Sequence, residues 1–353
     1  MQAPFPYFGG KRHAARLIWD AIGRDVAHYV EPFAGSLGCL LSEPARTGRT
    51  EAVNDLDGYV VNAWRAMQRD PEAVAHHADW PVSELDLTAR HLWLVNEGKP
   101  DPARLATDPD WFDAKAAGWW IWGACCWIGT NWCDGQGPWT RERIAGIDGD
   151  AGRGVRRQLP HLGNAGRGVH RKLPHLGDAG QGVHRKLPHL GNAGQGVHRK
   201  RIDWLLEWFG VLSDRLDRVR ITCGDWTRVT TPAVLFAPSR ADSVRVGVLL
   251  DPPYSMDHGD RDTVYTHDGG DVFHAVADWA FANGDDPRLR IVLCGWDGDA
   301  TLPAGWRSVP WSKPGGSGYA NGTGRNTQGR ERLWLSPHCL TNDAALPLFA
   351  SVA

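Results

Sequence analysis

The stretch Val246-Gly-Val-Leu-Leu-Asp-Pro-Pro-Tyr254 decides the fold of this chain. Its first five residues are apolar, which is typical of a strand buried on both faces of a parallel sheet. Asp251 and Tyr254 follow that strand directly, and open α/β sheets bind ligands at the carboxyl ends of their strands. Pro252 and Pro253 prevent helix formation and leave carbonyls facing outward. The stretch therefore predicts a carboxylate, a carbonyl and an aromatic ring at a ligand-binding edge.

Further short elements on both sides of this stretch alternate between strand and helix. Strands are expected over residues 28–31, 51–54, 219–223, 246–250, 289–294 and 331–335, and helices over residues 37–41, 58–67, 202–216 and 271–282. This βαβ rhythm predicts an α/β fold with a largely parallel sheet.

The middle of the chain departs from that rhythm. Residues 66–150 are rich in Trp and predict helices, with 116–133 forming a core that packs against the sheet. Residues 151–201 repeat with a period of 14, and each unit contains Gly and Pro, so we expect turn-rich structure there. The repeats hold eleven Lys or Arg and one acid, a net charge of +10 in a chain whose formal charge is −2. A basic module on an acidic body predicts contact with nucleic acid.

Bulk composition excludes several classes of protein. The chain has 353 residues, of which 42% are hydrophobic, enough for a sizeable core. It contains no run of about 18 apolar residues, and its N-terminus does not resemble a secretory signal, so we expect no membrane partner. Seven cysteines without a CxxC pair argue against a disulfide framework or a structural zinc site. We expect reduced thiols in a cytoplasmic protein.

The Asp251–Tyr254 tetrapeptide suits an exocyclic amine on a flat base. The carboxylate and a proline carbonyl can each accept an N–H bond, and Tyr254 can stack on the ring. Such an amine is a poor nucleophile because its lone pair is delocalised into the ring. Two well-placed acceptors localise that lone pair, and positioning for in-line attack on an activated methyl group supplies much of the remaining acceleration.

Two N-terminal motifs add a nucleotide-like ligand to this prediction. Glu31-Pro-Phe-Ala-Gly-Ser-Leu-Gly38 follows the first strand, where small residues allow a ligand to approach closely. Asn54-Asp-Leu-Asp57 follows the second strand, where a carboxylate can bind ribose hydroxyls. Each motif alone is also compatible with an ordinary turn or helix cap. Three such motifs in this order are much rarer by chance.

The three motifs together resemble those of the Dam-like, D12-class N6-adenine DNA methyltransferases of the α-group. Phe5-Pro-Tyr-Phe-Gly-Gly-Lys11 is similar to the family's N-terminal cofactor motif, and Cys223-Gly-Asp-Trp226 to the position that holds the cofactor adenine. The closing segment 330–339 resembles the last strand of phage members. The resemblance covers about 1–65 and 202–340.

The resemblance implies a cofactor and a set of site residues. The cofactor is S-adenosylmethionine, and no metal is needed. The expected catalytic residues are Asp251, Pro252, Pro253 and Tyr254. The expected cofactor contacts are Tyr7, Phe8, Gly9, Gly10, Lys11, Glu31, Pro32, Phe33, Gly35, Ser36, Asp55, Asp225 and Trp226.

The implied fold is a Rossmann-like methyltransferase domain with an inserted target-recognition region. We expect 1–65 and 202–340 to form the catalytic domain, 66–150 the helical part of the insertion, 151–201 the repeats and 341–353 a tail. The repeats occupy the place of the family's recognition hairpin, so sequence preference stays open. We expect DNA contacts from the basic pairs of the repeats, Arg156, Arg157, Arg171, Lys172, Arg185, Lys186, Arg199 and Lys200. Base reading and a solvated spacer are the alternatives. Residues 313–332 predict a surface loop or a lid.

The predicted activity is methylation of N6 of an adenine flipped out of double-stranded DNA, without an obligate protein partner. The alternatives are N4-cytosine methylation, which Asp251 in place of Ser disfavours, and a catalytically silent DNA-binding protein of the same fold. Protein glutamine methylation is less compatible, because those enzymes resemble Asn-Pro-Pro-Tyr. The expected location is the cytoplasm of a bacterium or a phage-infected host. A role in restriction–modification, anti-restriction or regulation stays open.

Overall fold

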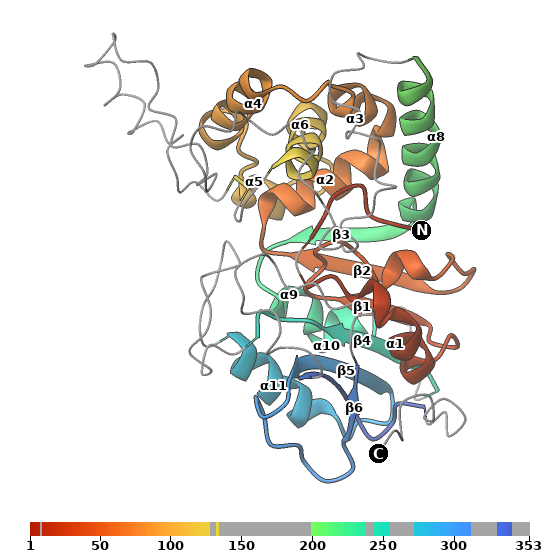
Figure 1. The fold of residues 1–353 in the computed structure, drawn as a ribbon. Helices are drawn as coiled ribbons and strands as arrows, with labels where there is room; N and C mark the ends of the chain where they lie inside the picture. The colour runs from red at the N-terminus through yellow and green to blue at the C-terminus, as the bar shows by residue number, and fades with distance from the viewer. Residues whose placement is uncertain are drawn as a thin grey trace, which may run out of the picture.

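One seven-stranded sheet forms the centre of the protein (Figure 1). The computed structural model describes residues 1–7, 9–127, 132–133, 199–237, 243–254, 272–311 and 330–340. Its strands are β1 (His28–Glu31), β2 (Thr50–Asp55), β3 (Val219–Cys223), β4 (Val246–Leu250), β5 (Leu289–Trp296), β6 (Arg307–Pro310) and β7 (Glu331–Leu335). They lie in the order β3-β2-β1-β4-β5-β7-β6. The first five run parallel, and β7 is antiparallel to both β5 and β6.

The sheet confirms the predicted α/β, Rossmann-like fold. Every expected strand is present, with its ends within two residues of the expected ends. The sequence signal is clearest for β4 and β5, which are buried along their whole length. Strand β6 was not predicted. It is four residues long, ends at a proline and alternates between half-buried and exposed positions, so it carries no apolar signal.

Helices cover both faces of the sheet. In chain order they are η1 (Lys11–His13), α1 (Ala15–Ile22), η2 (Leu40–Ser42), α2 (Gly58–Arg69), α3 (Pro71–Ala78), α4 (Glu84–Asn96), α5 (Pro102–Thr107), α6 (Ala114–Cys126), α8 (Arg199–Leu216), α9 (Thr227–Thr230), α10 (Pro232–Leu235) and α11 (Val272–Asn283). Helices α1 and α11 pack on opposite faces of β5, in two separate hydrophobic clusters. In the part of the chain that the model describes, no helix is long and apolar enough to cross a membrane.

Helices α2 to α6 and α8 gather beyond the β3 edge of the sheet (Figure 1). The Trp-rich helix α6 is buried, as expected, with Trp120 and Trp122 in the core. Its packing partners are α2, α3 and α4, while α2 contacts β2 and β3. The expectation that this segment packs directly against the sheet is therefore wrong, because α2 fills the space between them.

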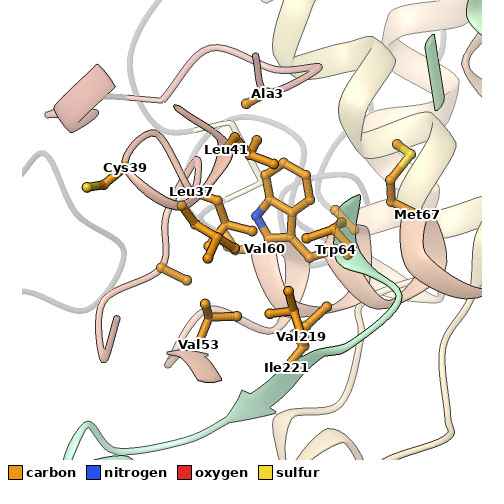
Figure 2. Close-up of a cluster of buried hydrophobic side chains, with 14 of the residues drawn as sticks. Ala3, Leu37, Cys39, Leu41, Val53, Val60, Trp64, Met67, Val219 and Ile221 are labelled. Carbon is orange, nitrogen blue, oxygen red and sulfur yellow. The ribbon is translucent and has the colours of Figure 1, made fainter. Parts of the chain in front are cut away.

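Trp64 of α2 joins this helical layer to the sheet. Figure 2 shows its indole among Val53 of β2, Val219 of β3 and Leu37 of the loop after β1. Trp64 is 1% exposed, and its ring N–H donates to the Gly35 carbonyl at 2.8 Å. The same side chain thus fills the core and holds the loop that follows β1.

One expected helix is wrong, one expected domain boundary falls inside a helix, and most of the repeats lie outside the described residues. The helix expected over 37–41 is wrong, because Leu37 has a left-handed φ of 52° and only the short 3-10 turn η2 follows. The expected boundary between residues 65 and 66 falls inside α2. The repeats lie outside the described residues up to 198, and residues 199 and 200 begin α8.

Candidate active site

The chain changes direction across the sheet between β1 and β4. From β1 it proceeds to β2 and β3 on one side, and later to β4 and β5 on the other. Such a switch point leaves a crevice at the carboxyl ends of the two central strands, where open α/β sheets bind ligands. The motif that begins at Glu31 follows β1, and Asp251 follows β4. The fold therefore brings the two motifs to one crevice.

The two glycine motifs contact each other on the β1 side of this crevice. A Cβ added to Gly35 would lie 2.6 Å from the Tyr7 ring, and one added to Gly10 would lie 2.9 Å from the Ser36 hydroxyl. Gly35 also has a left-handed φ of 45°. Position 35 therefore requires glycine, because a side chain there would be strained and would meet the Tyr7 ring, whereas a side chain at position 10 would require the Ser36 hydroxyl to move. Phe8 lies outside the described residues.

Asn54, near the end of β2, links the loops that follow β1 and β3. Its side-chain amide donates to the Pro32 carbonyl at 3.2 Å and to the Gly224 carbonyl at 2.8 Å, and the residue is 1% exposed. Its Oδ1 accepts from the Thr222 hydroxyl at 3.0 Å. Sequence reasoning missed this role, although an amide directly after the apolar Ala52-Val53 pair was a signal of a buried polar contact.

Asp55 holds the glycine loop through its carboxylate. Oδ2 accepts from the Gly35 backbone N–H at 2.8 Å, and Oδ1 accepts from the Asp57 N–H at 2.9 Å. Burial, and then the charge of Asp57, raise the pKa of Asp55 to about 6. Each carboxylate oxygen has a second lone pair, so the group can still accept hydroxyl donors.

Two aromatic rings flank the crevice beyond Asp55. Phe33 and Trp226 lie with their ring planes 27° apart and their centroids 6.5 Å apart. Trp226 also meets Trp279 of α11 edge-on. The adjacent Asp225 is exposed, and its Oδ1 accepts from the Thr227 N–H at 2.9 Å.

Glu31, at the end of β1, is a buried acid beneath the same loop. It is 3% exposed and accepts from the Tyr29 hydroxyl at 2.7 Å. Burial raises its pKa to about 8, despite the hydrogen bond from Tyr29. At neutral pH the side chain is therefore largely protonated in the protein.

Lys11 reaches across the crevice to Asp251. Its Nζ lies 2.6 Å from the Asp251 Oδ1 and donates to the Gly9 carbonyl at 2.9 Å. The lysine side chain is only 4% exposed and that of Asp251 20%. Burial, the largest single influence, lowers the pKa of this amine, but the charge of Asp251 together with those of Tyr254, Cys294 and Glu331 outweighs it, and the pKa of Lys11 is raised well above its usual value. A residue expected to contact the cofactor thus contacts the predicted catalytic carboxylate.

Tyr254, Trp296 and Trp311 form an aromatic wall beside the Lys11–Asp251 ion pair. Tyr254 meets Trp296 of β5 edge-on at 6.0 Å, and the Lys11 Nζ lies 5.0 Å from the Tyr254 ring and 5.8 Å from the Trp311 ring. The Arg330 guanidinium lies 5.0 Å from the Trp296 ring. Sequence reasoning missed Trp296 and Trp311. Both lie at the ends of strands, β5 and β6, where ligand-facing residues gather.

The predicted DNA-contacting residues cannot be located relative to this site, since most fall outside the described part of the chain. Six of them, Arg156, Arg157, Arg171, Lys172, Arg185 and Lys186, lie outside the described residues. Arg199 and Lys200 are the first two residues of α8. Most of the 313–332 loop also lies outside the described residues. Of its residues, Arg332 pairs with Asp297 at 2.8 Å.

The N-terminal part of the chain is similar to a known protein family. The family model described as D12 class N6 adenine-specific DNA methyltransferase matches residues 7–86. A search of curated proteins found no match. The matched residues include Tyr7–Lys11 of the N-terminal motif, the loop after β1 and Asp55, and the sheet places Asp251–Tyr254 beside them. Over residues 7–86 the chain is therefore similar to the D12 class N6 adenine-specific DNA methyltransferases, a family that uses S-adenosylmethionine, and the seven-stranded α/β fold agrees with a methyltransferase.

Proposed function

We propose that the enzyme methylates an adenine flipped out of duplex DNA, with Asp251 and Pro252 holding the N6 amine and Tyr254 stacking on the base. The observation that carries this proposal is the Lys11–Asp251 pair at 2.6 Å, which keeps a carboxylate charged at the end of β4. A charged carboxylate accepts hydrogen bonds only, which is what a donating amine requires.

The residues on the β1 side fit S-adenosylmethionine. Two aromatic contacts of about 3.5 Å each add up to about 7 Å, so the Phe33–Trp226 spacing of 6.5 Å accommodates a planar base after a small opening. The Asp55 carboxylate would accept ribose hydroxyls, and Asp225 would accept from the base amine. Tyr7, Gly9, Gly10, Glu31, Pro32, Gly35 and Ser36 would surround the methionine end. The bound cofactor supplies a methyl group already activated on a sulfonium.

The protein's own contribution is orientation and proton acceptance. Asp251 Oδ1 is held by Lys11, and a carboxylate has several lone pairs, so the same group can also accept an N–H bond from the amine. Once the nitrogen has been methylated it becomes acidic, so Asp251 need not be a strong base. The amine loses one proton, toward Asp251 or water, and N6-methyladenine and S-adenosylhomocysteine are the products. Pre-organised acceptors of this kind act without reorganisation at the moment of reaction.

Nucleoside mass spectrometry of unmethylated DNA incubated with the enzyme and S-adenosylmethionine tests this proposal. N6-methyladenine should be the main product, and Asp251→Asn should abolish it while DNA affinity is retained. The exposed Asp217→Asn is the matched control and should stay fully active. N4-methylcytosine as the product, or an active Asp251→Asn enzyme, would overturn the assigned roles.

The repeats supply the proposed contact with the DNA backbone. Their net charge of +10 contrasts with the acidic remainder of the chain. Each cation that neutralises a phosphate steepens the salt dependence of binding by about 0.9 in log–log slope. Replacing Arg171, Lys172, Arg185 and Lys186 by Gln should therefore weaken binding and flatten that slope by up to about 3.6. An unchanged slope would favour a spacer. The proposed setting is the cytoplasm of a bacterium or phage-infected cell, without an obligate protein partner.

A further inference from the structure

Cys294 lies beside the catalytic carboxylate on the neighbouring strand. Leu250 of β4 is paired with Leu293 of β5, so Asp251 and Cys294 are the next positions along the two parallel strands. Side chains alternate between the faces of a sheet, and both residues therefore project away from the face of Leu250 and Leu293. Cys294 is fully buried. Lys11 approaches Asp251 on this same side. Its Nζ lies near the rings of Tyr254 and Trp311, which belong to the same hydrophobic cluster as Cys294.

The register of β4 and β5 brings the Cys294 thiol next to the Asp251 carboxylate, within reach of a hydrogen bond. Burial first, and then the Asp251 charge, raise the pKa of Cys294 well above its usual value, so the thiol stays protonated at neutral pH. A charged carboxylate can only accept, and the thiol is therefore the donor. A protonated thiol is also a poor nucleophile, which protects it beside a methylating reagent.

To direct a lone pair at an amine, a carboxylate needs more than one ionic or hydrogen-bond contact, because a single contact leaves the group able to rotate. The Lys11 ammonium is a compact charge on a flexible stem and fixes the position of Oδ1 better than the rotation of the group. Cys294 belongs to β5, which is buried along its whole length, and sites built on rigid strands are held more closely than sites on loops. The thiol thus adds a second, rigid anchor.

We propose that Cys294 is a positioning residue for methyl transfer: its S–H and the Lys11 ammonium together orient the Asp251 carboxylate toward the target amine. This inference rests on the role of Asp251 given under the proposed function. Its consequence is that removal of the thiol donor slows the chemical step and leaves substrate binding nearly unchanged.

Steady-state kinetics of three variants test the inference. Cys294→Ala should lower kcat about 10-fold with little change in KM, since it removes one hydrogen bond to a charged group. Cys294→Ser keeps a donor at the same place and should stay within about 3-fold of the wild type. Cys339→Ala is the matched control, because its thiol is also buried and hydrogen-bonded, to the Ile291 carbonyl of β5, and should leave kcat unchanged.

Affinity for S-adenosylhomocysteine and thermal unfolding show whether each variant is folded. Equal losses in the Ala and Ser variants, or an Ala variant as active as Cys339→Ala, would overturn the inference. A wild-type enzyme without N6-methyladenine product would instead overturn the proposed function.

The S–H stretching band gives a second readout that needs no activity. Subtracting the infrared spectrum of Cys294→Ser from that of the wild type isolates the Cys294 band among the seven cysteines. Asp251→Asn should move this band to higher frequency, because a neutral amide is a weaker acceptor than a carboxylate. A band that does not move would show that the thiol does not donate to Asp251.

Discussion

Replacing Lys11 by methionine removes a cation that the fold holds 2.6 Å from the Asp251 carboxylate. At that distance two unit charges attract by about 6 kcal/mol at an effective dielectric constant of 20. Desolvation of the lysine, only 4% exposed, offsets part of this attraction. Asp251 is 20% exposed, so water partly replaces the lost cation. We therefore expect a coupling free energy of about 2–3 kcal/mol between the two side chains.

A double-mutant cycle in urea unfolding measures that coupling, from Lys11→Met, Asp251→Asn and the double variant. The exposed pair Arg69–Asp110, at 3.3 Å and with both side chains more than half exposed, is the control and should couple by at most about 1 kcal/mol. Lys11→Met should also lower kcat about 100-fold, because the carboxylate loses the group that orients it. A coupling no larger than that of the control pair would refute the reasoning.

The coupling should not depend on pH in the neutral range. The pKa of Lys11 is raised in the folded protein, so its stabilising effect is fully present below the unfolded pKa of about 10.4 and is lost only as the pH rises through the higher folded value. Cycles run at pH 7 and pH 9 should agree. A coupling that collapses by pH 9 would mean that Lys11 titrates earlier than its surroundings indicate.

Three further predictions concern the cofactor loop, the core and acid stability. Gly35→Ala should weaken S-adenosylhomocysteine binding at least about 10-fold in calorimetry, since its Cβ would lie 2.6 Å from a ring, whereas Gly210→Ala, in open space, should not. Arg215→Met should cost about 3–5 kcal/mol in urea unfolding, because it removes one of the two arginine partners of the buried Glu51, 2.6 Å away, and the donor to the Glu43 and Leu40 carbonyls, and exposed Arg218→Met should cost less than about 0.5. Burial lowers the pKa of His91 to about 4, so stability should fall as the pH drops from about 6.5 toward 4. His91→Phe should remove about 2 kcal/mol of the loss between pH 7 and 5, and an unchanged loss would contradict this.

Much of the fold could be predicted because its signals are local. The apolar runs of β4 and β5 and the helical spacing in α8 each report burial directly. Strand β6 and the turn at Leu37 could not be predicted, since β6 depends on pairing with β7 and the turn on a left-handed backbone. Neither the pairing with β7 nor the left-handed backbone at Leu37 produces a pattern in the local sequence.

The candidate site, too, could be predicted only in part from the sequence. The residue types and their order after β1, β2 and β4 already indicated a methyl transfer to a base amine, because that chemistry needs a carboxylate, a carbonyl and a ring at strand ends. Which residues meet was decided only in three dimensions. Lys11 pairs with a residue 240 positions later in the chain, Asn54 ties loops that follow β1 and β3, and Cys294 adjoins Asp251 through strand register.

The sequence by itself thus determined the class of fold and indicated the reaction and the proposed catalytic motif, since each depends on residue type and spacing along a strand. Tertiary structure alone decided the partners of Asp251, the aromatic wall of Tyr254, Trp296 and Trp311, and the separation of α6 from the sheet. The physical reason is that hydrogen bonds, ion pairs and ring contacts act over a few ångströms in space. The order of strands in the sheet, and not distance along the chain, sets which side chains come within that range.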